Sequence, residues 1–598
     1  MQNAVMNEEA SAENGRLTLT VGDLLMLGVL IIGIVLRFTD LGVQPLTPAE
    51  AETAWTAWAF WQPDSLMLAE GSPLYYSLTR LLTPILGFSD GTMRLVPAIF
   101  GVALLALPWL WRARIGIIGA LVMGLFLAIS PLQTHTSRFV GSDATAVFTT
   151  LLLLVSVFQY LETQQRNWLL TAVVSLALGL SSTPLFFSSL LTLGVAFGLY
   201  RAIGMSLTEK EDELTGADDD DDDSSTSPYT LVISPSDRRV ALILFTAVFV
   251  SVTTLFLWNP AGIGTAVRMV SSWLAGFNFN NFEAVSSPFL SFFRYQPGLV
   301  FLGFLAMGWA TWTNHPLGSF CIYWFAAIVI LALAQPGVQG LALLMTLPAT
   351  ILVALLANQY LSAVWDLENS LIAIGSFVVL MLMWVNLARF LRIVTFNPDN
   401  LVNLWIILFV LVFAGTLIFF LTSVEESIFI QGPLLALILF FAFYGWGTAW
   451  WLGHDGFNDT RERWITSATD DDVRVLIPVI DELSRQVSNS SFDLDILSHV
   501  ESSVLQWYLR DYVNLEFAET IPVTANNAVI ITPSTVELSL PNDYLGSDYG
   551  LLRPEPQLVT SETMFVDTLR WWLFQDSPTP LPEDRVILWL RSDLTVVE

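Results

Sequence analysis

Residues 21–38 read VGDLLMLGVLIIGIVLRF, an apolar run with one acidic residue near its start and one arginine near its end. As a helix rising about 1.5 Å per residue, it would cross nearly all of the roughly 30 Å hydrocarbon core of a bilayer. No small-residue cleavage site of the signal-peptide kind follows it, so we interpret this segment as a retained membrane anchor. The polar residues 1–20 before it predict a disordered N-terminal tail.

Similar apolar runs recur as far as residue 452, and about 13 in all are long enough to span a membrane. A shorter run, Leu74–Phe88, is typical of a re-entrant or tilted piece. The composition agrees, because 54% hydrophobic and 13% charged residues give too little charge to cover a water-soluble protein of 598 residues. The sequence therefore predicts an α-helical polytopic membrane bundle, whose spans after the first are residues 93–111, 115–132, 144–161, 168–182, 185–203, 240–258, 298–313, 318–334, 340–361, 369–388, 401–421 and 429–452.

Changes in composition divide the chain. Residues 206–238 are rich in Ser and Asp and include six consecutive aspartates at 218–223, which predicts a disordered cytoplasmic loop between membrane halves 21–205 and 239–453. This acidic loop is either a solvated linker or a tail for docking or cation binding. Residues 454–598 combine amphipathic helical patterns with short buried strands, which predicts a small α/β domain.

Arginine positions give an orientation. With a cytoplasmic N-terminus, most basic residues of the first half fall inside, whereas Arg389 and Arg392 fall on the other side. An odd number of spans then places the C-terminal domain outside the cell membrane.

The single cysteine excludes an intrachain disulfide, and the formal net charge of −29 disfavours nucleic-acid binding, which needs a basic surface.

Polar clusters beside span ends are the first candidates for function, because charge at membrane depth is costly. The predicted topology places three on the outer face: TPAEAE at 47–52, SRFVGSD at 137–143, and the loop 259–297. A carboxylate at the mouth of a bundle can serve as a general base or hold a divalent cation, and arginine suits a lipid phosphate. The alternative is structural, with carboxylates capping helices and arginines anchoring at the interface.

Five stretches carry a family resemblance: LRFTDLGVQPLTPAEAETAW at 36–55, GSPLYYSLTRLLTPILGFSDGTMRLVPAIFGV at 71–102, ISPLQTHTSRFVGSDATAVF at 129–148, LQWYLRDYVNLEF at 505–517 and RVILWLRSDL at 585–594. The chain resembles the GT-C superfamily of membrane glycosyltransferases, which includes protein O-mannosyltransferases and the aminoarabinose transferases of lipid A. Within it, the chain is most similar to the flippase-activity-associated glycosylation proteins.

This resemblance implies a hexosyltransferase that uses a polyprenyl-phosphate-linked sugar among membrane lipids and serves a protein or lipid acceptor on the extracytoplasmic face. A carboxylate would deprotonate the acceptor hydroxyl, which attacks the anomeric carbon and displaces the lipid phosphate with inversion. By resemblance, Glu50 is the catalytic carboxylate and Glu52 and Asp143 are its helpers. Arg138 and Arg94 would bind the donor phosphate. A divalent cation is the only cofactor that this chemistry suggests, and no ligands for it are assigned.

The sequence departs from the family pattern at several motif positions. Ala49 stands where the family has its key aspartate, and Glu50 matches the adjacent glutamate. Gly141-Ser142 and Pro184-Leu185 replace a basic pair and a Lys-Glu pair. These changes leave a second hypothesis open, a catalytically degenerate GT-C protein that binds or helps to flip lipid-linked glycans. A transporter would be expected to show inverted repeats, and the sequence shows none.

The segment around Trp507, Tyr508 and Arg510 has two interpretations. Its aromatic and guanidinium groups would line an acceptor site facing the bundle, or they would form the core of the C-terminal domain, since aromatic side chains usually bury for packing.

Overall fold

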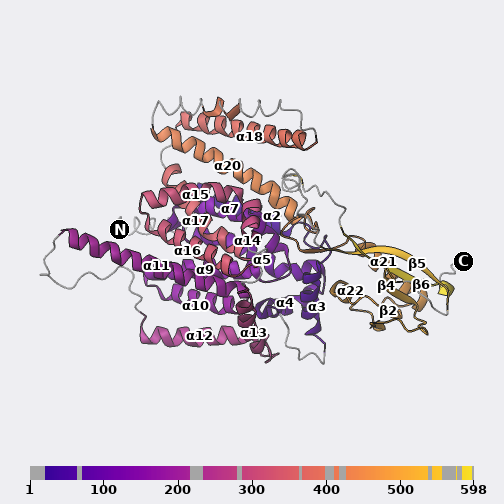
Figure 1. Cartoon of the computed structure of the whole chain (residues 1–598). Coiled ribbons are helices and arrows are strands. Elements are labelled where there is room, and N and C mark those ends of the chain that lie inside the picture. Colours follow the sequence, from indigo (N-terminus) through magenta and orange to yellow (C-terminus); the bar gives the residue numbers. More distant parts are fainter. Residues whose placement is uncertain are drawn as a thin grey trace, which may run out of the picture.

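The computed structural model describes residues 20–62, 71–215, 233–278, 286–362, 366–396, 426–536, 542–554 and 582–594, with isolated positions between 410 and 415 and at 574. Figure 1 shows a helical bundle with a smaller domain at one end. The helices before that domain are α2 (Val21–Phe38), α3 (Pro48–Ala59), α4 (Pro73–Leu86), α5 (Asp90–Leu110), α6 (Arg112–Ile115), α7 (Ile117–Ala128), α8 (Pro131–Arg138), α9 (Asp143–Thr163), α10 (Arg166–Leu180), α11 (Pro184–Thr215), α12 (Pro235–Thr253), α13 (Gly262–Ala275), α14 (Ser286–Tyr295), α15 (Pro297–Trp312), α16 (Pro316–Ala334), α17 (Leu341–Leu361), α18 (Leu367–Phe396) and α20 (Glu426–Gly453).

The polytopic membrane bundle is confirmed, with fewer spans than predicted. Among the described residues, eight helices are long and apolar enough to cross a membrane, or up to ten if two bent pairs each count as one span. Three predicted spans account for the difference from 13. Residues 168–182 form α10, which has only 15 residues. Residues 240–258 correspond to α12, whose first turn carries the charged residues Asp237, Arg238 and Arg239. Residues 401–421 lie mostly outside the described part of the chain.

Both bent pairs break immediately before a proline. Helices α7 and α8 meet at 57° before Pro131, and α14 and α15 meet at 96° before Pro297. Proline disfavours helical backbone at the residue before it, and Ser130 is indeed extended, with ψ 117°. The first of these bends turns α8 out of line with α7, in the part of the chain that leads to Asp143.

Burial separates central helices from peripheral ones. In α17 the apolar window is 94% buried by neighbouring helices, whereas in α18 the corresponding figure is 6%. Figure 1 places α17 inside the bundle and α18 at its edge.

The acidic loop predicted at 206–238 falls mainly on residues 216–232, which lie outside the described residues. At the edges of this predicted loop, α11 continues to Thr215 and α12 begins at Pro235.

The C-terminal domain contains a mixed sheet in the order β1-β5-β6-β4-β2-β3. Strands β2 and β3, and β2 and β4, pair in parallel, and the other neighbours are antiparallel. The predicted small domain containing helices and strands is therefore confirmed. Its elements are β1 (Ser467–Thr469), α21 (Val473–Ser488), β2 (Ile496–Ser498), α22 (Ser503–Tyr508), β3 (Leu515–Phe517), β4 (Val529–Pro533), β5 (Tyr544–Pro554), β6 (Asp584–Arg591) and the 3₁₀ helix η2 (Ser592–Leu594).

This domain is fastened to the bundle through α22. Trp507 Nε1 and the Tyr508 hydroxyl donate to the two carboxylate oxygens of Asp90, at 2.9 and 2.7 Å. The Tyr508 oxygen also accepts from the Leu46 amide at 2.9 Å, and Arg510 donates to the Phe88 carbonyl at 3.0 Å. These contacts hold the domain against the first turn of α5 and the loop after α2.

Candidate functional site

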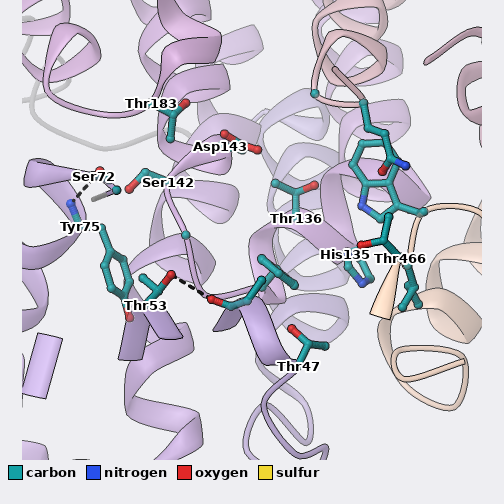
Figure 2. Close-up of a pocket in the computed structure, with 18 of the residues that line it drawn as sticks. Thr47, Thr53, Ser72, Tyr75, His135, Thr136, Ser142, Asp143, Thr183 and Thr466 are labelled. Carbon is teal, nitrogen blue, oxygen red and sulfur yellow. Dashed lines mark hydrogen bonds between the residues drawn. The ribbon is translucent and has the colours of Figure 1, made fainter. Parts of the chain in front are cut away.

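A cavity of about 360 Å³ lies between α3, α8, the start of α9 and the segment entering the C-terminal domain. Figure 2 shows its side chains converging from these elements around one space. The volume is within the roughly 300–1,000 Å³ common for small-molecule sites. Most of its polar lining consists of hydroxyl groups, contributed by Thr47, Thr53, Ser72, Tyr75, Thr136, Ser142, Thr183, Thr466 and Ser467.

The first turn of α3 decides which residues of the TPAEAE stretch face this cavity. Thr47 is the N-cap, and it forms a capping box with Glu50, the reciprocal arrangement in which each side chain binds the other's backbone N–H. Ala49 and Thr53, four residues apart and hence on one helix face, line the cavity. Glu52 is exposed, and neither Glu50 nor Glu52 is among the lining residues.

Glu50 points into a fully occupied polar network. Arg94 donates from Nε to Oε1 at 2.9 Å and from Nη2 to Oε2 at 2.7 Å. The Thr47 amide donates to Oε2 at 3.0 Å, and the Val140 amide donates to Oε1 at 2.9 Å. Glu50 is fully buried, and each of its oxygens accepts two hydrogen bonds. The carboxylate therefore joins α3, α5 and the turn between α8 and α9.

Asp143 is the one predicted carboxylate that lines the cavity, and it is the only Asp or Glu among the described lining residues. It occupies the first position of α9, directly after the turn that contains Gly141 and Ser142. Asp143 is thus placed to accept a proton from a group bound in the cavity.

The two predicted phosphate-binding arginines are buried beside the cavity and do not line it. Arg94 uses all five of its N–H groups, on Glu50 and on the carbonyls of Leu41, Gln44 and Pro45. Arg138 donates through its two terminal nitrogens to the carbonyls at the end of α2 and just after it, of Leu36, Thr39 and Asp40. Its Nε has no hydrogen-bond partner among the described residues.

Sequence reasoning missed several lining residues, His135 foremost. This histidine lies in α8 and is 3% exposed. Its ring stacks on Phe139 and Phe457, with centroid distances of 5.9 and 4.8 Å. The signal available in the sequence was the polar run QTHTSR at 133–138, which follows an apolar span and is costly at membrane depth unless it has a role. The predicted acceptor-site residues Trp507, Tyr508 and Arg510 are also absent from the lining. They contact the bundle at Leu46, Phe88 and Asp90 instead.

Within the described ranges, no group of three or more His, Cys, Asp or Glu side chains could hold a metal ion. The described cavity wall offers a single carboxylate, which is a poor match for the several oxygen ligands that divalent cations require.

Comparison with known proteins agrees with this architecture. Residues 70–202 match the family model described as dolichyl-phosphate-mannose-protein mannosyltransferase. The structure is similar to the crystal structure of ArnT from Cupriavidus metallidurans bound to undecaprenyl phosphate, with a TM-score of 0.50 and 14% sequence identity over 96% of this chain and 99% of that chain. For the apo state of the same protein the TM-score is 0.45, with 16% identity over 82% of this chain and 85% of that chain. The search of curated protein sequences found no match.

At this identity, the likeness to ArnT shows the fold. That fold, a helical membrane bundle with a C-terminal domain, is the one that the sequence resemblance implied. The matched family region ends within α11 and contains α8, α9 and Asp143, so the first half of the bundle carries both the family likeness and most of the cavity wall.

Proposed function

We propose that this protein transfers a sugar from a polyprenyl-phosphate donor to a protein or lipid acceptor on the extracytoplasmic face, within the subgroup of flippase-activity-associated glycosylation proteins. One observation carries the proposal: in a bundle with the GT-C fold, the cavity beside the first loop presents the carboxylate of Asp143 amid a hydroxyl-rich wall. The undecaprenyl phosphate bound by the structurally similar ArnT suggests the class of donor.

Asp143 is the general base in this proposal. Its carboxylate takes the proton of the acceptor hydroxyl, and the acceptor oxygen forms a bond to the anomeric carbon of the sugar. The bond from that carbon to the phosphate oxygen breaks, and the electron pair leaves with the polyprenyl phosphate, which inverts the anomeric configuration. Glu50 has no comparable freedom, because its oxygens accept from Arg94, Thr47 and Val140. We assign it to holding the cavity wall in place.

Arg138 is the proposed contact for the leaving phosphate, because Arg94 has no N–H left to donate. A guanidinium matches phosphate oxygens well, and Arg138 Nε is the group still without a partner among the described residues. Reaching the cavity would require the side chain to rotate away from the carbonyls at the end of α2.

A second function, binding or helping to flip a lipid-linked glycan without transfer, is favoured by one observation. Ala49 lines the cavity, so the position where the family carries its key aspartate faces the ligand space without a carboxylate. The fold and the cavity would then be kept for recognition alone.

The deciding experiment uses the full chain in lipid nanodiscs with radiolabelled decaprenyl-phosphate mannose and glucose, and with a membrane extract that supplies protein and lipid hydroxyl acceptors. For a transferase with Asp143 as base, wild type transfers the labelled sugar from the donor and Asp143→Asn binds the donor but transfers little. The control Glu519→Gln, at an exposed position, behaves as wild type. Donor binding without release by wild type supports the second function. Absence of donor binding overturns both.

A further inference from the structure

The cavity wall holds a buried histidine whose polar atoms have no partner within the described structure. His135 is 3% exposed, and neither Nδ1 nor Nε2 forms a hydrogen bond with any described residue. Its position is nevertheless well fixed, because the ring lies within 28° of parallel to Phe139 and within 26° of parallel to Phe457. The protein therefore orients an imidazole edge while leaving its hydrogen-bonding capacity unused.

Three hydroxyl groups of the same wall share this condition. The side-chain oxygens of Thr136, Ser142 and Thr183 are buried and have no hydrogen-bond partner in the described residues, and all three residues line the cavity with His135. Buried polar groups in native proteins are almost always paired, and leaving them unpaired costs stability. Four such residues lie around one cavity, and because their polar atoms are buried in this structure, the wall must open slightly for a ligand to supply the missing partners.

The charge of the wall narrows the class of ligand. Among the described lining residues, Asp143 is the only carboxylate, and none is Lys or Arg. A neutral imidazole offers one donor and one acceptor, and each hydroxyl offers both. Sugar hydroxyls, which also donate and accept, match this set. A uronic acid would instead bring its carboxylate close to that of Asp143 without a lining cation to offset it.

We infer that His135, Thr136 and Ser142 form a sugar subsite that hydrogen-bonds the hydroxyl groups of a neutral hexose, and that His135 is its main ligand-binding residue. The inference rests on the proposed function, since it takes the sugar to be the head group of the polyprenyl-phosphate donor. It assigns the imidazole to recognition of the sugar, separate from the base Asp143 and from any contact with the phosphate.

The test compares three variants of the full chain in nanodiscs. His135→Phe keeps an aromatic ring between Phe139 and Phe457 but removes both nitrogens, and His135→Gln restores a donor and an acceptor. The matched control is His454→Phe. His454 is also a buried histidine stacked on an aromatic ring, here Trp450 at 4.0 Å, but it does not line the cavity.

The probes are decaprenyl-phosphate mannose, decaprenyl-phosphate glucuronic acid and decaprenyl phosphate without sugar. Binding of the mannose lipid should weaken about tenfold or more in His135→Phe, the loss expected for one or two hydrogen bonds. Binding of the bare decaprenyl phosphate should not change. His135→Gln should recover part of the affinity, and His454→Phe should match wild type. Wild type should bind the glucuronic acid lipid less tightly than the mannose lipid.

Thermal unfolding without ligand is a second measurement, and its expected result differs from the result for a histidine with a purely structural role. His135→Phe should be at least as stable as wild type, because it removes two unpaired buried nitrogens. If His135→Phe instead unfolds at lower temperature and binds the mannose lipid as wild type does, the subsite is wrong while the proposed function stands. Equal affinity of wild type for the mannose and glucuronic acid lipids overturns the neutral-sugar assignment. If wild type binds no decaprenyl lipid at all, the proposed function itself fails, and this inference fails with it.

Discussion

Glu50 and Arg94 form a buried two-pronged ion pair, with Nε–Oε1 at 2.9 Å and Nη2–Oε2 at 2.7 Å. The pair joins α3 to α5, and through the Val140 amide it also holds the turn that precedes Asp143. The residue that the family resemblance marks as catalytic therefore has both of its carboxylate oxygens occupied by hydrogen bonds within the protein.

The first prediction concerns this pair. Arg94→Met leaves the Glu50 carboxylate buried without its charge partner, which should lower the free energy of unfolding by about 3–5 kcal/mol. Unfolding by SDS titration in mixed micelles measures the change. The matched control is Arg485→Met, which removes an exposed arginine that faces Glu482 at 4.0 Å and should change stability by about 1 kcal/mol or less. A loss as small in Arg94→Met as in the control would contradict a structural role for the pair.

The second prediction restores the missing family carboxylate. Ala49 is exposed to the cavity, so Ala49→Asp adds a carboxylate to the wall without displacing a packed neighbour. If sugar transfer takes place in this cavity, a second general base should raise transfer from decaprenyl-phosphate sugar roughly tenfold or more. Ala49→Asn, equal in size and neutral, should give no increase. Equal rates for the two variants would place the reaction elsewhere.

The capping box at Thr47 and Glu50 shows how far the sequence could predict this site. The spacing T-x-x-E is a recognisable helix start, and capping was the structural alternative for the carboxylates of this stretch. The partners Arg94 and Val140 come from distant parts of the chain, and no local pattern identifies them. Asp143 was predicted by the resemblance and does line the cavity. His135 was missed because the absence of a partner is a property of the folded surroundings.

Hydropathy predicted the bundle well and its span count less well. Apolar runs locate helices, but window length alone does not separate a full span from α10, which is too short at 15 residues, or from α12, which begins with a charged turn. The bends before Pro131 and Pro297 follow from local chemistry. Their angles depend on packing between helices, which the sequence alone does not provide.

The third prediction concerns docking of the C-terminal domain. Tyr508→Phe removes the hydroxyl that bonds Asp90 and the Leu46 amide, leaving both without that partner, and should cost about 1–3 kcal/mol. Hydrogen exchange of the Leu46 amide should accelerate, while exchange in the sheet of the domain should not. Unchanged exchange at Leu46 would mean that Tyr508 does not fasten the domain.

The same contact predicts a dependence on alkaline pH. Burial, and next the Asp90 carboxylate, raise the pKa of Tyr508 above its ordinary value. The folded state therefore holds this proton more tightly than the unfolded state does. The resulting stability is complete below the ordinary tyrosine pKa of about 10 and declines as pH rises above it. Limited proteolysis between residues 454 and 473 measures how firmly the domain is docked. Above that pH, the cleavage rate of wild type should rise more steeply with pH than the cleavage rate of Tyr508→Phe.

The fourth prediction tests the orientation. Glu52 is exposed, and the only cysteine of the chain, Cys321, is buried. In a Cys321→Ala background, Glu52→Cys should react with a membrane-impermeant maleimide added to intact cells. Reaction only after the cells are permeabilised would place the first loop, and the cavity with it, on the cytoplasmic side.

Photo-crosslinking addresses the ligand most directly. A decaprenyl-phosphate mannose carrying a diazirine on the sugar, irradiated with the full chain in nanodiscs, should label peptides that contain residues 130–143 and 457–467, and unlabelled decaprenyl-phosphate mannose should suppress this labelling. Labelling confined to other helices, or labelling that the unlabelled lipid does not suppress, would contradict a sugar-binding cavity between α3, α8 and α9.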